Sequence, residues 1–184
     1  MRPVGVWLLA GACTDAGTGP VPTDDAGRCP ETLEVTLGTG LDAYLALADG
    51  DPAQMVHGPQ GGWHIDSAGL VTGPSIQVAI TPSLHLGDRQ IAGDQQPWFT
   101  ALAAWDAESC SGEFWGVRAY IDDEVTGLPP GTDVLQDYIC PLAGQSLRFS
   151  VVVEDLDSGV TSTDEVTVRV LLDPYDVNAC AAGA

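Results

Sequence analysis

The sequence predicts an all-β protein, an antiparallel β-sandwich of seven to nine strands, on two observations. Short stretches in which apolar and polar residues alternate recur along the chain, which is typical of strands with one buried and one solvated face. The 22 glycines and 13 prolines lie between these stretches, as expected where turns join many short strands. With 184 residues, of which 45% are hydrophobic and 17% charged, the chain is apolar enough to fold, and its length favours one domain.

The first expected strands lie in the N-terminal half of the domain. Leucine and valine alternate with polar residues over 33–37, and the pattern stops at Gly38. A shorter apolar stretch, 45–47, ends at Asp49, and a third alternating stretch, 76–80, ends before a proline. Clusters of Gly, Pro and Asp favour turns, so each of these stretches is expected to be a complete strand.

The later expected strands show the clearest alternation. Residues 115–121 have apolar side chains at every second position, and so do 147–153 and 166–172, which are separated by a turn at 155–159. Only residues 98–105 have apolar spacing that suits a helix, enough for two helical turns. One short helix or loop excursion is therefore expected near 97–112.

The closing pair of strands, 146–172, resembles the last two strands of immunoglobulin-like bacterial surface domains, PKD-like and cadherin-like domains among them. The shared features are an alternating strand over 146–155 that ends in aspartate, a turn containing Gly159, and a final strand rich in Thr and Val. The resemblance implies an immunoglobulin-like sandwich. A shared fold of this kind implies no particular activity.

The first thirteen residues predict export. One arginine follows Met1, an apolar stretch comes next, and small residues lead to Cys13, which is the arrangement of a signal peptide over residues 1–12. Leu-Leu-Ala-Gly-Ala-Cys resembles the lipobox of bacterial lipoproteins, which implies cleavage before Cys13 and acylation of its thiol as a lipid anchor. In those families an aspartate after the cysteine retains the protein at the inner membrane, so Thr14 favours the outer membrane.

The domain organisation follows from the composition after the lipobox. Residues 13–28 contain almost no large apolar side chain, so they are expected to form the lipidated N-terminus and a flexible linker. Residues 29–180 are expected to form a single sandwich domain, followed by a short tail, 181–184. No apolar run approaches the roughly 20 residues that a membrane-spanning helix needs, so the lipid is the only contact expected with the membrane.

Four cysteines remain besides Cys13, an even number that predicts two disulfides in an exported chain. Three pairings are possible. We expect Cys29–Cys180, which would join the two ends of the domain, and Cys110–Cys140, which would close its central part. None of the four has the spacing of a zinc knuckle or a CxxC redox site, so their expected role is structural.

The charge and the missing motifs exclude several classes of function. Six arginines and no lysine stand against 26 acids, which gives a net charge of −20 and a pI near 4.1. Such a surface repels nucleic-acid phosphates and anionic lipid heads. The sequence also has no Gly-x-Ser-x-Gly, no His-Glu-x-x-His, no phosphate loop and no dinucleotide-binding glycine pattern. It therefore predicts a protein that is not an enzyme and has no nucleic-acid partner.

Residues 55–65 contain candidate metal ligands. Two β-like pieces flank Gly-Pro-Gln-Gly-Gly, which suits a tight turn. If they pair, His57 and His64 would lie close together beside Met55, a set that would suit copper or zinc with His85 as a further ligand. The Cys-x-His-x-Met cluster of blue-copper domains is missing, and the favoured interpretation is that the histidines only hydrogen-bond the loop. The Gly-Pro-Gln-Gly-Gly-Trp-His block resembles a loop of myxobacterial lipoproteins to which no activity is assigned, and this implies secretion alone.

Two pairs of acids at strand ends are calcium candidates. Asp49 with Asp51, and Asp155 with Asp157, would supply oxygen ligands if their loops met at one end of the sandwich, as in cadherin-like modules. Neither pair matches an EF-hand loop, and turn chemistry alone favours Asp before Gly. The expectation is therefore a protein without a bound cofactor.

Four tryptophans, Trp63, Trp98, Trp105 and Trp115, follow the signal peptide. They would form a sugar-stacking platform if exposed, although tryptophans buried in a sandwich core are commoner. The favoured function is a cell-envelope lipoprotein, anchored at the outer membrane and facing the periplasm or the cell surface. Its disulfide-linked sandwich would be a non-catalytic binding, adhesion or structural module for a protein or glycan that the sequence does not identify. The alternatives are a periplasmic copper- or zinc-binding protein and a carbohydrate-binding domain.

Overall fold

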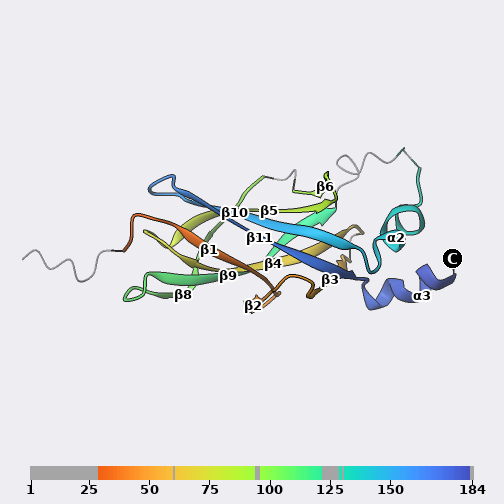
Figure 1. The fold of residues 1–184 in the computed structure, drawn as a ribbon, viewed down its shortest axis with the longest axis horizontal. Helices are drawn as coiled ribbons and strands as arrows, with labels where there is room; N and C mark the ends of the chain where they lie inside the picture. Colours follow the sequence, from red (N-terminus) through yellow and green to blue (C-terminus); the bar gives the residue numbers. More distant parts are fainter. Residues whose placement is uncertain (1–28, 60, 94–95, 122–128, 130, 183–184) are drawn as a thin grey trace, which may run out of the picture.

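A computed structural model describes residues 29–59, 61–93, 96–121, 129 and 131–182. Within these residues the chain is mostly strand, and its short helical segments lie at 135–142 and 174–182 (Figure 1). The strands are β1 (Glu34–Thr39), β2 (Leu45–Ala46), β3 (Pro52–His57), β4 (Trp63–Thr72), β5 (Gln77–Leu86), β6 (Arg89–Ala92), β7 (Trp98–Ala101), β8 (Ala103–Asp106), β9 (Ser111–Ile121), β10 (Ser146–Asp155) and β11 (Thr161–Leu171). The helical segments are η1 (Leu135–Ile139), α2 (Cys140–Leu142) and α3 (Pro174–Ala182). The predicted all-β sandwich is confirmed, with eleven strands in the described residues in place of seven to nine.

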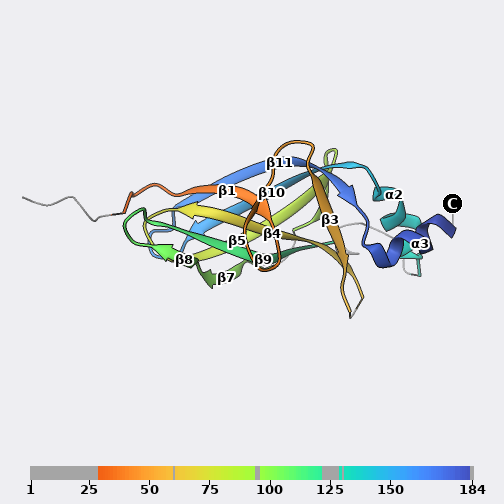
Figure 2. The same cartoon turned by 90° about the horizontal axis from the view of Figure 1, so that it is seen from below.

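Two layers of strands form the sandwich (Figures 1 and 2). One layer has the order β2-β1-β4-β9-β8 and the other has the order β11-β10-β5-β7. β3 joins the layers by pairing with β4 and, in parallel, with β11, and β6 joins them by pairing with β5 and β9. The layers are thus continuous at the end that carries β3 and β6, and elsewhere the chain crosses between them from β7 to β8.

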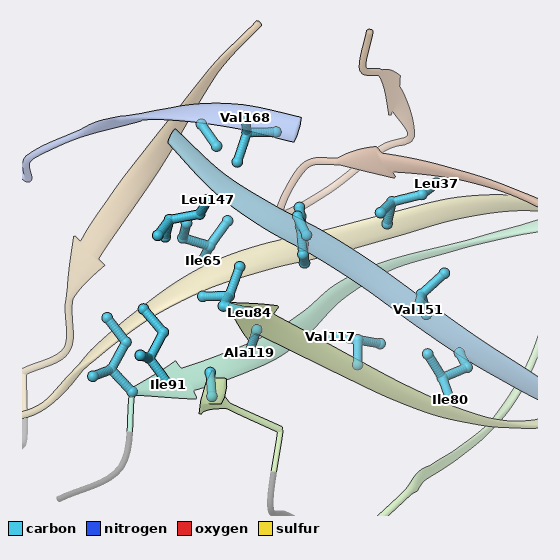
Figure 3. Packing of buried hydrophobic residues seen from close by; sticks show 14 of the residues in the cluster. Leu37, Ile65, Ile80, Leu84, Ile91, Val117, Ala119, Leu147, Val151 and Val168 are labelled. Carbon is cyan, nitrogen blue, oxygen red and sulfur yellow. The ribbon is translucent and has the colours of Figure 1, made fainter. Parts of the chain in front are cut away.

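The core lies between the two layers, as the alternation predicts. In β10 the inward side chains Leu147, Phe149, Val151 and Val153 are all fully buried, and Val168 of β11 is buried beside them. Figure 3 shows the labelled members of this set pointing into the same interior as side chains from the opposite layer. Burying a side chain of this size stabilises the fold by about 1.5–3 kcal/mol, so these strands supply much of the free energy that holds the layers together.

A β-bulge in β9 changes which residues of the expected strand face the core. Ser67 of β4 pairs with Val117, whereas Gly69 pairs with Phe114, so two residues of β9 stand opposite one residue of β4. The extra residue shifts the alternation, and Phe114 is buried where a regular strand would bury Trp115. Gly116 has φ +67°, and a Cβ there would lie 2.9 Å from the carbonyl oxygen of Leu41, so glycine is required at the bulge.

The helix or loop excursion expected near 97–112 is not helical. β7 pairs with β5, and β8 pairs with β9, so the chain crosses from one layer to the other between them. The crossing residue is Leu102, which is 3% exposed and donates its N–H to the carbonyl of Ile76 at 2.8 Å. The apolar spacing suits a helix, but the unpaired edges of β5 and β9 offer backbone hydrogen bonds to an extended chain, and this tertiary pairing overrides the local pattern.

The disulfide pairing differs from the expected one. The structure joins Cys29 to Cys110 and Cys140 to Cys180, with Cα–Cα distances of 5.4 and 5.3 Å. β1 starts opposite the end of β4, which lies opposite the start of β9, and this brings Cys29 beside Cys110. The segment that leads into β1 and helix α3 lie toward opposite ends of the long axis (Figure 1). The expected Cys29–Cys180 bond would therefore need two Cα atoms far beyond the 7 Å that a disulfide spans.

No helix among the described residues is long and apolar enough to cross a membrane. The expectations for residues 1–12, for Cys13 and for the linker up to residue 28 lie outside the residues that the structure describes.

Candidate functional site

The β3–β4 hairpin carries three of the four predicted metal ligands and projects from the sandwich beside α3 (Figure 2). Its cross-strand pairs are Met55 with Ile65, Val56 with His64, and His57 with Trp63. The Gly58 N–H donates to the carbonyl of Gly62 at 2.9 Å, which closes the loop. Because successive side chains of a strand point to opposite faces, His57 and Trp63 share one face of the hairpin and His64 lies on the other.

A buried carboxylate joins the hairpin to the C-terminal helix. One oxygen of Asp176, Oδ1, accepts from His57 Nδ1 at 2.8 Å, and the other, Oδ2, accepts from Trp63 Nε1 at 2.7 Å. Asp176 is fully buried. A carboxylate can be buried at this position because both of its oxygens are hydrogen-bonded. The bond to Asp176 requires a proton on Nδ1 of His57, because a carboxylate oxygen only accepts.

Aromatic rings surround this carboxylate, and a hollow opens beside them. The ring of His57 lies 4.6 Å from that of Trp63 and 5.5 Å from that of Tyr175, between centroids. The hollow measures about 290 Å³ and is lined by His57, Tyr175 and the loop residues Gly58, Pro59 and Gly61. Tyr175 is 80% exposed, so a large aromatic surface is open to a ligand at this end.

A second aspartate, Asp173, holds the start of α3 against the hairpin. Its Oδ2 accepts from the backbone N–H of His57 at 2.9 Å and its Oδ1 from that of Tyr175 at 2.8 Å. The bond from His57 is the main cause that lowers the pKa of Asp173, and partial burial opposes it. Asp173 followed by Pro174 is also a helix-start pattern, with a capping carboxylate before a proline in the first turn.

Stability is expected to fall in acid because of two aspartates. Burial raises the pKa of Asp155, but hydrogen bonds from Ser75, Ser158 and the Asp157 N–H outweigh it, so this pKa is lowered, as it is at Asp173. A lowered pKa in the folded state gives stability that is complete above the ordinary value of 3.8 and is lost as the pH falls through the lower, folded-state value. Urea unfolding should therefore show a constant midpoint near neutrality and a decreasing one below about pH 4.

The matched variant for this acid effect is Asp173→Asn, which retains a hydrogen-bond acceptor without a titrating group. Its unfolding midpoint should depend less on pH below about pH 4 than that of the wild-type protein. Identical pH profiles of the two proteins would show that Asp173 contributes nothing to the acid effect.

The opposite face of the hairpin carries a separate polar cluster. His64 Nε2 lies 3.5 Å from Asp66 Oδ1, and Arg118 Nε lies 3.8 Å from the same oxygen. Arg118 Nη1 donates to the Tyr120 hydroxyl at 2.9 Å, and this bond is the main cause that raises the pKa of Arg118. His64 is 3% exposed. A hollow of about 230 Å³ lies between this cluster and Pro59 of the loop.

The structure does not bring the four predicted metal ligands together. His57 and His64 lie on opposite faces of the hairpin, and Met55 is fully buried in the core. His85 lies on β5, opposite Arg148 of β10. Among the described residues, no group of three or more His, Cys, Asp or Glu side chains is placed to hold a metal ion. The copper or zinc hypothesis therefore gains no support from the fold.

The two predicted calcium pairs also lie apart. Asp49 accepts from the N–H of Thr167 in β11, whereas Asp155 is the last residue of β10, next to the turn that leads to Thr161 at the start of β11. Six residues of strand separate the two places, which is about 20 Å. Asp155 Oδ1 accepts from the N–H groups of Asp157 and Ser158 and from the Ser158 hydroxyl. Asp51 Oδ2 accepts from the N–H of Ala48. The carboxylates of Asp51 and Asp155 therefore accept hydrogen bonds from residues of their own turns.

The four predicted tryptophans divide between three places. Trp63 belongs to the hairpin cluster, and Trp105 packs partly buried against the core. Trp98 is 40% exposed and lies with Trp115 in a groove of about 370 Å³ between β7 and β9. The structure therefore brings Trp98 and Trp115 into one surface feature and separates Trp63 from it.

Six residues of the hairpin clusters were not expected from the sequence: Asp66, Arg118, Tyr120, Asp173, Tyr175 and Asp176. The Asp-Pro pair at 173–174 is a signal that could have placed α3. Nothing local connects Asp176 with a histidine 119 positions earlier, because the contact depends on how β11 runs past β3.

Comparisons with known proteins identify no family. No protein-family model matches the chain, and no curated protein sequence is significantly similar to it. One solved structure with some similarity is the CooA pilin subunit from enterotoxigenic Escherichia coli, at 14% sequence identity and a TM-score of 0.30, over 76% of this chain and 99% of that one. A similarity at this level does not extend to function.

Proposed function

We propose that this chain is an exported lipoprotein whose disulfide-linked sandwich is a non-catalytic binding module at the cell envelope. The observation that carries the proposal is the pairing of all four domain cysteines in two disulfides. Disulfides of this kind persist in the oxidising compartments outside the cytosol. A lipid on Cys13 would then hold the domain at the membrane through the linker that ends at residue 28.

The geometry supports binding more than catalysis. Asp176 holds His57 and Trp63, and Asp173 holds the backbone of His57, so the polar groups of the hairpin cluster fix the position of α3. Hollows next to exposed aromatic side chains lie at two separate places: Tyr175, 80% exposed, lies beside the hairpin, and Phe99, 68% exposed, lies in the groove between β7 and β9. Exposed aromatic side chains that line a hollow are typical of surfaces that bind a ligand.

The position of the hairpin relative to the N-terminal end of the domain also suits a tethered binding module. Cys29, the first described residue, is fixed to Cys110 at one end of the long axis, and the β3–β4 hairpin and α3 lie toward the other end (Figure 1). An anchor that precedes residue 29 would therefore attach at the end away from the hairpin. The hairpin hollows would face outward from the membrane.

The test is membrane fractionation of the full chain expressed in a Gram-negative bacterium, with radiolabelled palmitate in the medium. The wild-type protein should carry the label and sediment with the outer membrane, and Cys13→Ser should carry none and appear in the soluble periplasmic fraction. Cys13→Ser is its own folding control, because its two disulfides should form as in the wild type. An unlabelled wild-type protein in the soluble fraction would contradict the anchor, and free thiols at the four domain cysteines would contradict export.

A further inference from the structure

We infer that the groove between β7 and β9 binds a neutral saccharide, an inference that rests on the proposed function and names its ligand class. The groove is lined by residues of β7, by Ala103 and by residues 113–117 of β9. Its volume of about 370 Å³ falls in the usual range of small-ligand sites, about 300–1,000 Å³. The groove lies where the chain crosses from one layer of the sandwich to the other, between β7, which pairs with β5, and β8, which pairs with β9.

The bulge in β9 places an aromatic side chain in this groove. In a regular strand Trp115 would alternate with its neighbours and point into the core. The extra residue at Trp115–Gly116 buries Phe114 instead and leaves Trp115 half-buried in the groove lining. The Gly116 N–H donates to the Gly40 carbonyl at 2.9 Å, which holds the bulge in place. Bulges often re-aim a side chain at a functional site, and this one does so at the groove.

Strand β7, which forms the other wall of the groove, carries two large aromatic side chains that are exposed to solvent. Trp98 is 40% exposed and Phe99 is 68% exposed, although both belong to a strand of four residues. Exposing these rings next to an unpaired strand edge favours aggregation, and protein edges usually carry charged residues instead. A ligand that covers the rings would recover the free energy of burying them.

The chemistry of the lining matches a neutral saccharide. The faces of Trp98, Phe99 and Trp115 offer flat apolar surfaces to the C–H face of a sugar ring, and the carboxylate of Glu113 can accept from its hydroxyl groups. No arginine lies among the lining residues, and the net charge is −20. An anionic glycan would therefore be repelled, and an uncharged one would not.

The test uses the full chain with Cys13→Ser, which removes the acylation site, in affinity electrophoresis through gels that contain soluble neutral polysaccharides: mannan, glucan or galactan. At least one of them should retard the protein, and the retardation should be the same at low and high salt because the ligand is uncharged. Trp98→Ala and Phe99→Ala should each weaken the affinity by about ten-fold or more, as expected for an aromatic side chain at the centre of a binding site. Both side chains are partly exposed, so both variants should fold.

The matched control is Tyr175→Ala, which removes an 80% exposed aromatic side chain at the hairpin end and should leave the retardation unchanged. Equal weakening by Tyr175→Ala, or no retardation by any neutral polysaccharide, would overturn the inference. Retention only on an immobilised peptide library would also overturn it, because the groove would then bind an extended strand. None of these outcomes changes where the wild-type protein fractionates, so failure here is distinguishable from failure of the proposed function.

Discussion

Replacing Cys29 and Cys110 together by alanine is expected to lower the free energy of unfolding by about 4 kcal/mol. The bond closes a loop with a sequence separation of 81, and the entropy of an open loop of that length in the unfolded chain corresponds to about 4.5 kcal/mol before any strain is subtracted. The bond also fixes the chain at the start of β1, where β1, β4 and β9 run side by side. Its loss is therefore expected to release the first residues of β1 as well.

Urea unfolding followed by circular dichroism measures this effect. The comparison is Cys140→Ala with Cys180→Ala, whose separation is 40; the loop entropy there corresponds to about 3.9 kcal/mol before strain, slightly less than for the first bond. The two double variants should differ in hydrogen exchange: the first should lose protection in β1, and the second in η1 and α3. A stability equal to wild type after removal of Cys29 and Cys110 would mean that this bond does not form in the protein.

Asp176→Ala is expected to lower the free energy of unfolding by about 2–3 kcal/mol. The substitution leaves His57 Nδ1 and Trp63 Nε1 without their acceptor, and each unsatisfied buried donor costs about 1–3 kcal/mol. The expected loss lies near the lower end of the summed cost of the two donors, because the side chain of His57 is 22% exposed and water can replace part of its lost hydrogen bond. The C-terminal helix should remain attached through the Cys140–Cys180 bond.

Tyr175→Ala is the matched control for this effect. It lies on the same helix, one residue away, and is 80% exposed, so its cost should stay within about 0.5 kcal/mol. The indole fluorescence of Trp63 should change in Asp176→Ala, because the indole N–H loses its carboxylate partner. Equal stability of the two variants would show that the buried carboxylate does not hold α3 to the hairpin.

The alternating pattern predicted the sandwich and the inward faces of β10 and β11 correctly, because burial on one face imposes that pattern on the sequence. It predicted β5 too short, since Pro82 was expected to end the strand. In the structure β5 continues to Leu86, and Pro82 lies opposite Val151 of β10, between the part of β5 paired with β7 and the part paired with β6. A proline without an N–H breaks no ladder at a place where the strand has a partner on one side.

The features that the sequence did not predict depend on contacts between distant segments. The disulfide pairing follows from which strand ends lie together, which local patterns do not contain. The site at Asp176 depends on β11 running past β3, a parallel pairing of segments more than 100 residues apart. The bulge at Gly116 turns Trp115 to the other face of β9, because one extra residue shifts the alternation of the side chains. The alternating pattern of the sequence does not show where such a residue is inserted.

Disulfide mapping tests the account most directly. The protein is purified from the bacterial envelope with its thiols blocked, digested without reduction, and analysed by peptide mass spectrometry. The expected result is two cross-linked peptide pairs, Cys29 with Cys110 and Cys140 with Cys180. Blocked free thiols at these positions, or a peptide that joins Cys29 to Cys180, would contradict both the fold and the compartment proposed for it.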